Sequence, residues 1–248
     1  MAEQTKVKFL VFRGTEEDNT LKEYTIDFVE GMVVLDAMLE IQAKYASDLG
    51  IRCNCKAAKC GSCTAEVNGM PRLMCKTRLS SLPVDKPIVI RPLKAFPLIK
   101  DLVSDISWNY EVNRKITPFT PKEDCDWRIY QDDVDRVQEF RKCIECFLCQ
   151  STCHVLRTHD KKDSYFGPRF LVRLAGLIMH PLDSIDRTEH VKEQAGIEYC
   201  NITGCCSEVC PEKIKITDNA IIPLKERTVS RYYDPLISIF RYFFRKKK

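Results

Sequence analysis

The sequence predicts an α+β protein with a β-rich first domain followed by a mostly helical second domain. Apolar residues alternate with mostly polar ones along residues 6–11 and again along 24–28, which is the period of half-buried strands. Beyond about residue 105 the apolar spacing becomes helical. Since 248 residues are enough for two modest domains, we expect one domain at residues 1–105 and a second at 106–248.

The two strand segments are expected to pair as a hairpin that an amphipathic helix covers. Val34, Met38, Ile41 and Tyr45 recur at helical spacing, and Gly50 follows where such a helix should have ended. The first domain should therefore contain one helix packed on its sheet.

A second hairpin is predicted at Asn68–Gly69, a dipeptide typical of tight two-residue turns. It lies between residues 64–67 and a short run that ends at Cys75, and Ile88–Ile90 supplies one more strand.

In the second domain, the apolar positions of residues 134–140 lead into Cys143. Pro168 stands at a predicted helix start, because proline suits the first helical position. The apolar face of that helix comprises Phe170, Leu171, Leu174, Leu177 and Ile178.

Composition and charge exclude several classes of protein. The mean hydropathy is −0.26, and no stretch approaches the roughly 20 apolar residues of a membrane-spanning helix. The N-terminal residues 1–4 carry no export signal, so we expect the chain in the cytoplasmic compartment. Residues 225–248 carry a net charge of +6 and the rest carries −2, unlike the basic folded domain of a nucleic-acid binder, so we expect no nucleic-acid partner.

The 14 cysteines form three groups, with Cys125 alone. Five lie in residues 53–75, four in 143–153 and four in 200–210. Structural disulfides are rare in a reducing compartment, so clustered cysteines indicate metal binding.

The first group has the plant-type spacing of a [2Fe-2S] ferredoxin, Cys55-x4-Cys60-x2-Cys63, followed by Cys75. We predict that these four cysteines bind a [2Fe-2S] cluster. A four-cysteine zinc site is the alternative, although zinc ribbons favour two matched C-x2-C pairs. Cys53 is surplus, and an exchange of ligand roles with Cys55 stays open.

The second group follows the bacterial ferredoxin run, in which three close cysteines hold one cluster and the fourth serves the other. We predict that a [4Fe-4S] cluster is held by Cys143, Cys146, Cys149 and the remote Cys210.

The third group lacks one cysteine of a standard second cubane, because Thr203 stands at that position. Cys153, Cys200 and Cys206 leave one iron corner without a thiolate, which predicts a [3Fe-4S] cluster. The neighbouring Cys205 could supply a fourth thiolate, and the alternative is a second [4Fe-4S] cluster.

Over nearly its whole length the chain resembles the iron–sulfur subunit of succinate dehydrogenases and fumarate reductases, the respiratory complex II. The motifs that carry the resemblance are Val34–Ala37, Cys60–Cys63, Asn68–Gly69, Arg91–Leu93, Ile99–Val103, Cys143–Cys146, Gly167–Pro168 and Cys210–Pro211. The resemblance implies a β-grasp plant-type ferredoxin domain followed by an all-α bacterial-type ferredoxin domain.

The same resemblance implies an electron-transfer subunit in the tricarboxylic acid cycle and respiratory chain. Electrons would pass from a flavoprotein subunit that carries FAD, through the three clusters, to a membrane-anchor subunit and quinone. The chain would lie peripherally on the cytoplasmic face of the cell membrane and bind no substrate itself. Two alternatives stay open, a fumarate reductase running in the opposite direction and a soluble ferredoxin-like electron carrier.

The chain departs from the family pattern near the third group. His154 replaces a usual proline, residues 155–158 lack a usual tryptophan, and Asn201 replaces a usual histidine. Because those family residues line the quinone pocket, we expect menaquinone or another non-ubiquinone acceptor, at or beyond the anchor. The aromatic, basic segment Pro235–Lys248 is expected to contact the membrane surface or the anchor.

Overall fold

The computed structural model describes residues 6–235, and these form two compact units. The first unit comprises the chain up to Tyr110, with Ile144–Thr152 and Val209–Pro211; the second comprises Glu111–Cys143, Cys153–Glu208 and the chain from Glu212 on. Because the units interleave along the chain, the domain ranges 1–105 and 106–248 stay a prediction. The expected membrane-contacting tail lies outside the described residues, except for Pro235.

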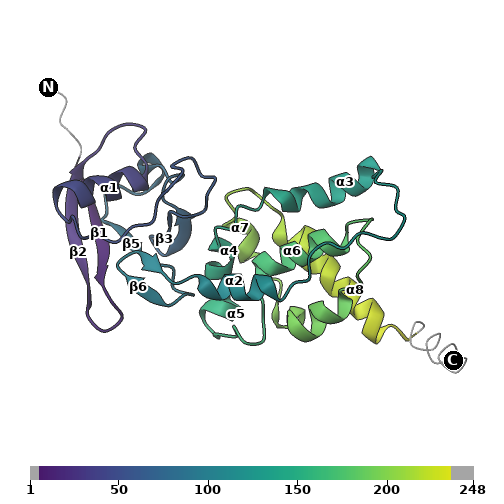
Figure 1. Cartoon of the computed structure of the whole chain (residues 1–248). Helices are drawn as coiled ribbons and strands as arrows, with labels where there is room; N and C mark the ends of the chain where they lie inside the picture. Colours follow the sequence, from purple (N-terminus) through teal and green to yellow (C-terminus); the bar gives the residue numbers. More distant parts are fainter. Residues whose placement is uncertain (1–5, 236–248) are drawn as a thin grey trace, which may run out of the picture. The chain divides into compact units, whose positions relative to one another are not determined.

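The first unit contains a five-stranded sheet (Figure 1). Its order is β2-β1-β5-β3-β4, and β1 and β5 are parallel while the other neighbours are antiparallel. The strands are β1 Lys6–Gly14, β2 Asn19–Asp27, β3 Thr64–Val67, β4 Met70–Leu73 and β5 Ile88–Arg91. The pairing of Phe9 with Tyr24 confirms the first predicted hairpin, and the fully buried residues Val7, Phe9 and Val11 lie on its core side.

Helix α1, Val34–Lys44, lies against this sheet as predicted (Figure 1). Val34, Met38 and Ile41 are completely buried, as the helical periodicity predicted, but the prediction was wrong for Tyr45, which follows the helix and is 57% exposed. The helix ends at Lys44, and a loop then leads to Gly50.

The second predicted hairpin is also present, because Val67 pairs with Met70 across Asn68 and Gly69. The φ angles of these two turn residues are +50° and +81°, as a type I′ turn requires. The remaining elements that begin in the first unit are η1 Leu79–Ser81, β6 Leu98–Lys100, β7 Val103–Ser104, α2 Ser107–Arg114 and α4 Leu148–Thr152.

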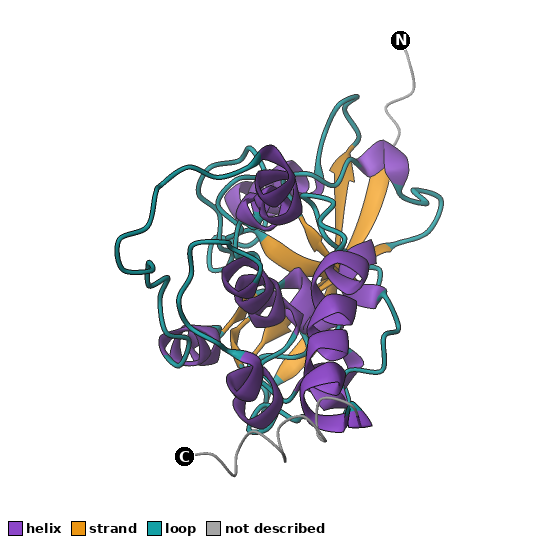
Figure 2. Cartoon of the chain, turned by 90° about the vertical axis from the view of Figure 1, so that its right-hand side faces the viewer, coloured by secondary structure: helices purple, strands orange, loops and turns teal. Residues whose placement is uncertain are grey.

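The described residues of the second unit form helices and loops without a strand. The helices of the chain are purple and its loops teal in Figure 2. The helices of the second unit are α3 Gln131–Gln138, η2 Glu139–Lys142, α5 His154–Arg157, α6 Pro168–Ile178, η3 His190–Gln194, η4 Ile197–Tyr199, α7 Cys205–Glu208, η5 Ile216–Ile221 and α8 Ile222–Tyr233. As predicted, Pro168 opens α6, whose Phe170, Leu171 and Leu174 are buried, whereas Leu177 and Ile178 at its end are half-buried.

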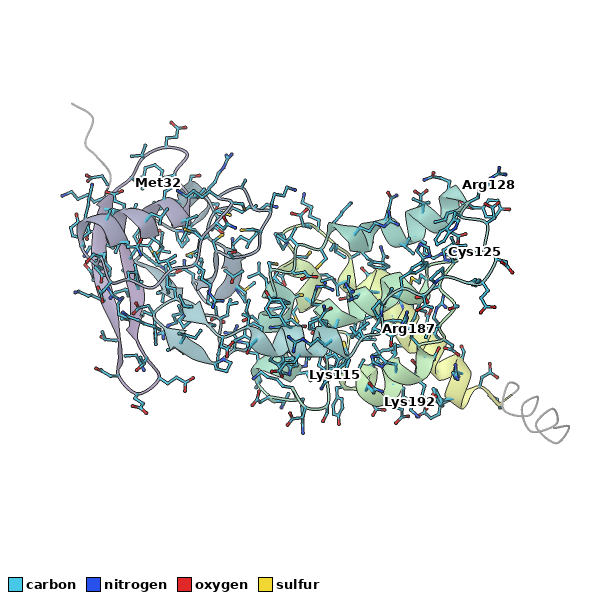
Figure 3. The ribbon with its side chains drawn as sticks, in the orientation of Figure 1. Met32, Lys115, Cys125, Arg128, Arg187 and Lys192 are labelled. Carbon is cyan, nitrogen blue, oxygen red and sulfur yellow. The ribbon has the colours of Figure 1, made fainter. Side chains whose placement is uncertain are left out.

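A buried ion pair holds part of this helical unit together. Arg187, labelled in Figure 3, lies 2.9 Å from Asp183 and donates a second hydrogen bond of 2.9 Å to the carbonyl of Pro118. The bond to Pro118 holds the start of the loop that carries Cys125, which is also labelled in Figure 3. Within residues 6–235, no helix combines the length and the apolar character needed to cross a membrane.

Candidate iron–sulfur centres

The first cysteine group lies on an irregular loop between α1 and β3. Three backbone N–H groups point at the sulfur of Cys55, from Ala57 at 3.4 Å, Lys59 at 3.3 Å and Cys60 at 3.3 Å. Hydrogen bonds to a sulfur favour its anionic form, which is the form that binds iron. The loop therefore offers three donors to one sulfur, an arrangement suited to a cluster ligand.

The backbone of this loop repeatedly enters the left-handed region. Lys56, Ala58 and Gly61 have φ angles of +53°, +55° and +68°. Left-handed residues between right-handed ones turn successive N–H groups to one side and form an anion-binding concavity. This explains why three donors reach one sulfur, and it fits an iron–sulfur cluster, whose sulfurs accept such hydrogen bonds.

The other three sulfurs of this group are close neighbours with different surroundings. A hydrogen bond from the Ser62 hydroxyl, with backbone N–H groups of Cys55 and Ser62, lowers the pKa of Cys60 to about 6. Burial raises the pKa of Cys63, whose sulfur accepts a 3.5 Å hydrogen bond from the Cys75 N–H. The structure thus brings Cys60, Cys63 and Cys75 together next to Cys55. Cys53 lies at the start of the loop.

The second cysteine group is divided by the boundaries of the compact units. Cys146, Cys149 and Cys210 belong to the first unit, although about sixty residues separate Cys149 from Cys210. Cys143 ends a segment of the second unit and is joined to this group by Ile144 and Glu145 along the chain. Glu145 and Phe147, on either side of the buried Cys146, have φ angles of +55° and +57°. This loop thus repeats the left-handed backbone of the first one.

The loops of the first two groups touch within the first unit. A Cβ atom on Gly61 would lie 2.8 Å from the Cα of Cys146 and 3.0 Å from the carbonyl oxygen of Ile144. A cavity of about 220 Å³ lies beside this contact, and Cys60, Ser62, Arg52 and Glu145 are among its lining residues.

The third group, Cys153, Cys200 and Cys206, lies in the second unit. Burial raises the pKa of Cys153 and of Cys206 to about 11, and the nearby sulfurs of Cys200 and Cys205 act in the same direction on both. Burial and neighbouring sulfurs both disfavour deprotonation of a thiol, whereas a bound iron cation stabilises the thiolate. The donor set therefore fits a metal cluster.

The loop between Cys200 and Cys206 is strained. Ile202 has a φ angle of +59°, which a β-branched residue rarely adopts, and Gly204 follows at +79°. The Thr203 hydroxyl lies 3.4 Å from the sulfur of Cys205. Strain of this kind persists where the surroundings enforce it, as at binding sites.

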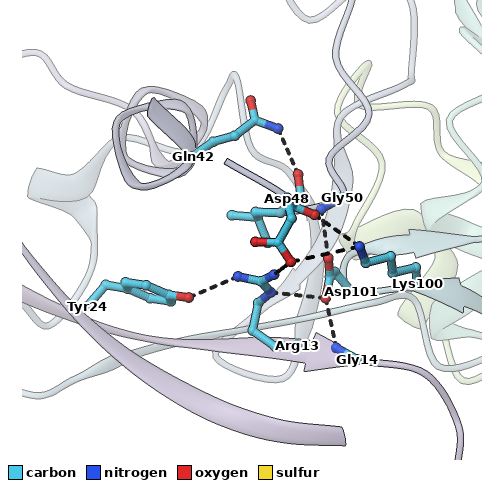
Figure 4. Close-up of polar contacts among 9 residues, drawn as sticks. Arg13, Gly14, Tyr24, Gln42, Asp48, Gly50, Lys100 and Asp101 are labelled. Carbon is cyan, nitrogen blue, oxygen red and sulfur yellow. Dashed lines mark hydrogen bonds and ion pairs between the residues drawn. The ribbon is translucent and has the colours of Figure 1, made fainter. Parts of the chain in front are cut away.

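A buried polar network anchors the chain just before the first cysteine loop (Figure 4). Asp101 is fully buried, and its carboxylate accepts hydrogen bonds from Arg13 at 3.0 Å, the Gly14 N–H at 2.7 Å and the Gly50 N–H at 2.8 Å. Burial lowers the pKa of Arg13, but hydrogen bonds to Asp48 and Asp101 more than offset this effect and raise the pKa above its ordinary value. The sheet is thereby tied to the loop that leads to Cys53.

Sequence reasoning missed two residues of functional interest, Asp101 and Tyr165. Asp101 lies in the motif Ile99–Val103, where the one acidic residue, between Lys100 and Leu102, was the available signal. Tyr165 directly precedes Phe166 and the motif Gly167–Pro168, and nothing in the sequence indicates that its side chain is fully buried.

Two family models match the chain in the expected order. A 2Fe-2S iron-sulfur cluster binding domain matches residues 8–111, and a 4Fe-4S dicluster domain matches residues 139–214. Together with the cysteine loops, these matches define a two-part iron–sulfur protein and confirm the predicted fold class.

A solved structure and a bacterial relative then identify the family. The chain is 52% identical to a chain of the Mycobacterium smegmatis Sdh1 complex in the apo form, with a TM-score of 0.92, and the match covers 94% of this chain and all of that one. It is 30% identical to the fumarate reductase iron-sulfur subunit of Escherichia coli O6:H1, over 86% of this chain and 90% of the relative. The chain belongs to the family of the iron–sulfur subunits of succinate dehydrogenases and fumarate reductases, as predicted.

Other relatives are much longer than this chain. A fumarate reductase (CoM/CoB) polypeptide of Methanothermobacter marburgensis is 32% identical over 93% of this chain. The chain spans only 45% of that relative and 41–45% of two further methanogen iron–sulfur proteins.

Proposed function

We propose that the chain is the electron-transfer subunit of a succinate dehydrogenase, which connects a flavoprotein subunit that carries FAD to a membrane anchor and quinone. The observation that carries this proposal is the presence of three cysteine groups on strained or donor-rich loops in a chain of this family. When bound, [2Fe-2S], [4Fe-4S] and [3Fe-4S] clusters would each take up and release an electron. The chain itself needs no substrate site.

Cys55, Cys60, Cys63 and Cys75 are the proposed ligands of the [2Fe-2S] cluster. The loop around Cys55 supplies three N–H donors, and the Ser62 hydroxyl supports the thiolate of Cys60. These groups hold the ligands in place and stabilise negative charge on their sulfurs.

The proposed ligands of the other clusters cross over along the sequence. The [4Fe-4S] cluster takes Cys143, Cys146, Cys149 and Cys210, and the third cluster takes Cys153, Cys200 and Cys206. The unit boundaries support the place of Cys210 in this assignment, because Cys210 is grouped with Cys146 and Cys149, whereas Cys206, only four residues earlier, is grouped with Cys153 and Cys200. Cys143 is the last residue of a segment of the second unit, and Ile144 and Glu145 connect it to Cys146. If each cysteine group of the sequence bound its own cluster, Cys206 and Cys210 would bind the same one.

For the third cluster we propose the [3Fe-4S] type, because a hydroxyl of Thr203 stands where a fourth thiolate is needed. The nearness of Cys205 to Cys153 and Cys206 favours a second [4Fe-4S] cluster as the alternative.

Membership of the family supports the proposed location and partners. We propose a peripheral position on the cytoplasmic face of the cell membrane, held by an anchor subunit, with a β-grasp domain at residues 1–105 and a helical domain at 106–248. Asn201 and His154 support a quinone other than ubiquinone, such as menaquinone. A fumarate reductase working in the opposite direction is the second candidate, because relatives carry both names.

The deciding experiment is EPR spectroscopy of the purified complex at stepped potentials, combined with assays in both directions. We expect three paramagnetic centres, one of them with a signal near g = 2 in the oxidised state, and succinate oxidation with both a dye and a quinone. Fumarate reduction faster than succinate oxidation would favour the second candidate. A preparation without iron, or a stable monomer that purifies without membranes, would contradict the proposal.

A further inference from the structure

Tyr165 lies beside the third cysteine group, on the segment that precedes α6. The Phe166 N–H donates a 3.2 Å hydrogen bond to the carbonyl of Ala195, and a Cβ atom on Gly196 would lie 1.9 Å from the carbonyl oxygen of Ser164. Residues 164–166 therefore pack directly against residues 195 and 196, which precede Cys200.

The side chain of Tyr165 is fully buried, and its hydroxyl makes no hydrogen bond of good geometry among the described residues, although the sulfur of Cys200 lies within its reach. Leaving such a group unpaired costs about 1–3 kcal/mol, so native proteins usually provide a partner. Since a phenylalanine would fill the same space without this cost, the hydroxyl needs an explanation.

The surroundings of the hydroxyl are sulfurs. Burial raises the pKa of Tyr165 well above its ordinary value, and the charges of Cys153, Cys200 and Cys206, together with a hydrogen-bond interaction with Cys200, act in the same direction. These are the three proposed ligands of the third cluster. The hydroxyl therefore lies beside sulfurs that can accept its hydrogen bond.

We propose that the Tyr165 hydroxyl donates a hydrogen bond to a sulfur of the third cluster site and thereby raises the reduction potential of that cluster. Reduction adds negative charge to the sulfurs, so a fixed donor stabilises the reduced state more than the oxidised one. Tyr165 is thus a positioning residue that tunes the last centre of the chain, and this inference rests on the proposed function.

The test is a redox titration of the intact complex, followed by EPR, in Tyr165→Phe and in a matched control. Tyr199→Phe is that control, because Tyr199 adjoins Cys200 but is 42% exposed. We expect Tyr165→Phe to lower the ratio of reduced to oxidised third cluster about tenfold at a fixed potential, which is about 59 mV for one electron. The first cluster in this variant, and all clusters in Tyr199→Phe, should keep their wild-type potentials.

An unchanged or raised potential in Tyr165→Phe would overturn the inference, whereas a wild-type complex without a third paramagnetic centre would overturn the proposed function. If Tyr165→Phe does not assemble, 3-fluorotyrosine at position 165 provides the second test. It keeps the shape of the ring and is a stronger donor, so the potential should rise. No change with this residue would also overturn the inference.

Discussion

Gly61 approaches the backbone of Cys146 so closely that there is no room for a side chain at position 61. A Cβ atom there would lie 2.8 Å from the Cα of Cys146, a distance that Cβ atoms do not adopt without movement of the neighbour. The φ angle of +68° also favours glycine. The loops that carry two proposed cluster sites are therefore in direct backbone contact.

Gly61→Ala should destabilise the protein more than Gly69→Ala. Gly69 also has a positive φ angle, but no atom lies within 4 Å of the position that a Cβ atom would take there, so alanine adds only backbone strain of about 1–2 kcal/mol. At Gly61 the clash with Cys146 is added to that strain. Thermal unfolding of both variants in the intact complex measures the difference, and equal losses of stability would show that the contact at Gly61 is loose.

Asp101→Asn should be strongly destabilising, because it leaves the largely buried Arg13 without its buried counter-charge. Breaking such a pair costs on the order of 3 kcal/mol. Asp48→Asn is the matched control, because Asp48 also binds Arg13, at 2.5 Å, but is largely exposed. We expect a clear fall in melting temperature for Asp101→Asn and a small one for Asp48→Asn; the reverse order would mean that Asp48 is the main partner of Arg13.

Cys60→Ala should abolish the EPR signal of the reduced [2Fe-2S] cluster, whereas Cys53→Ala should leave it intact. Cys60 lies in the donor-rich loop with the Ser62 hydroxyl on its sulfur, and Cys53 lies outside that arrangement. If the signal survived in Cys60→Ala but was lost in Cys53→Ala, the ligand assignment would be wrong.

Cys210→Ala should damage the [4Fe-4S] cluster first, and Cys206→Ala or Cys153→Ala should damage the third cluster. The reason is that Cys210 belongs to the unit of Cys146 and Cys149, whereas Cys206 and Cys153 belong to the other. EPR of each variant, in the oxidised and the reduced state, separates the two clusters. Loss of the third cluster in Cys210→Ala, with the [4Fe-4S] cluster intact, would contradict the crossover.

His190 should make the helical unit sensitive to mild acid. Burial, and then the charge of Arg187, lowers the pKa of His190 in the folded state, where its ring packs on Phe166 at 5.7 Å. The unfolded chain therefore binds the proton more readily, so this contribution to stability is complete above about pH 6.5 and is lost as the pH falls toward the folded-state pKa. The melting temperature of His190→Gln should fall less between pH 7 and pH 5.5 than that of the wild type.

The exposed His159 provides the control for this measurement. His159→Gln should keep the wild-type dependence of melting temperature on pH. If His190→Gln also kept it, another group would be responsible for the acid sensitivity.

Local patterns predicted much of the fold. The hairpin of β1 and β2, helix α1, the turn at Asn68–Gly69 and the start of α6 each depend on residues within a short stretch, so periodicity and turn chemistry suffice to find them. The cysteine groups could be recognised in the sequence for the same reason, because the spacing within each group is local, whereas their roles as cluster ligands stay a prediction.

The contacts between distant residues could not be predicted in this way. Arg13 and Asp101 are 88 positions apart, and nothing in either stretch indicates the other. Likewise, the burial of Tyr165 depends on packing against residues 195–200. The placement of Ile144–Thr152 in the first unit depends on contacts with a loop some eighty residues earlier.

The interleaving of the first unit bears on how the newly made chain folds. Its sheet can pair once Arg91 has left the ribosome, but the contact of Gly61 must wait for Cys146, and the 2.6 Å hydrogen bond from Lys76 to the carbonyl of Pro211 must wait longer still. Although an N-terminal part usually folds first during synthesis, this one is completed only after residue 211 has been added. The contacts that complete this unit join residues far apart in the sequence, and closing such long loops is slow. The first unit therefore stays unfinished on the ribosome until Glu111–Cys143 and Cys153–Glu208 of the second have also been made.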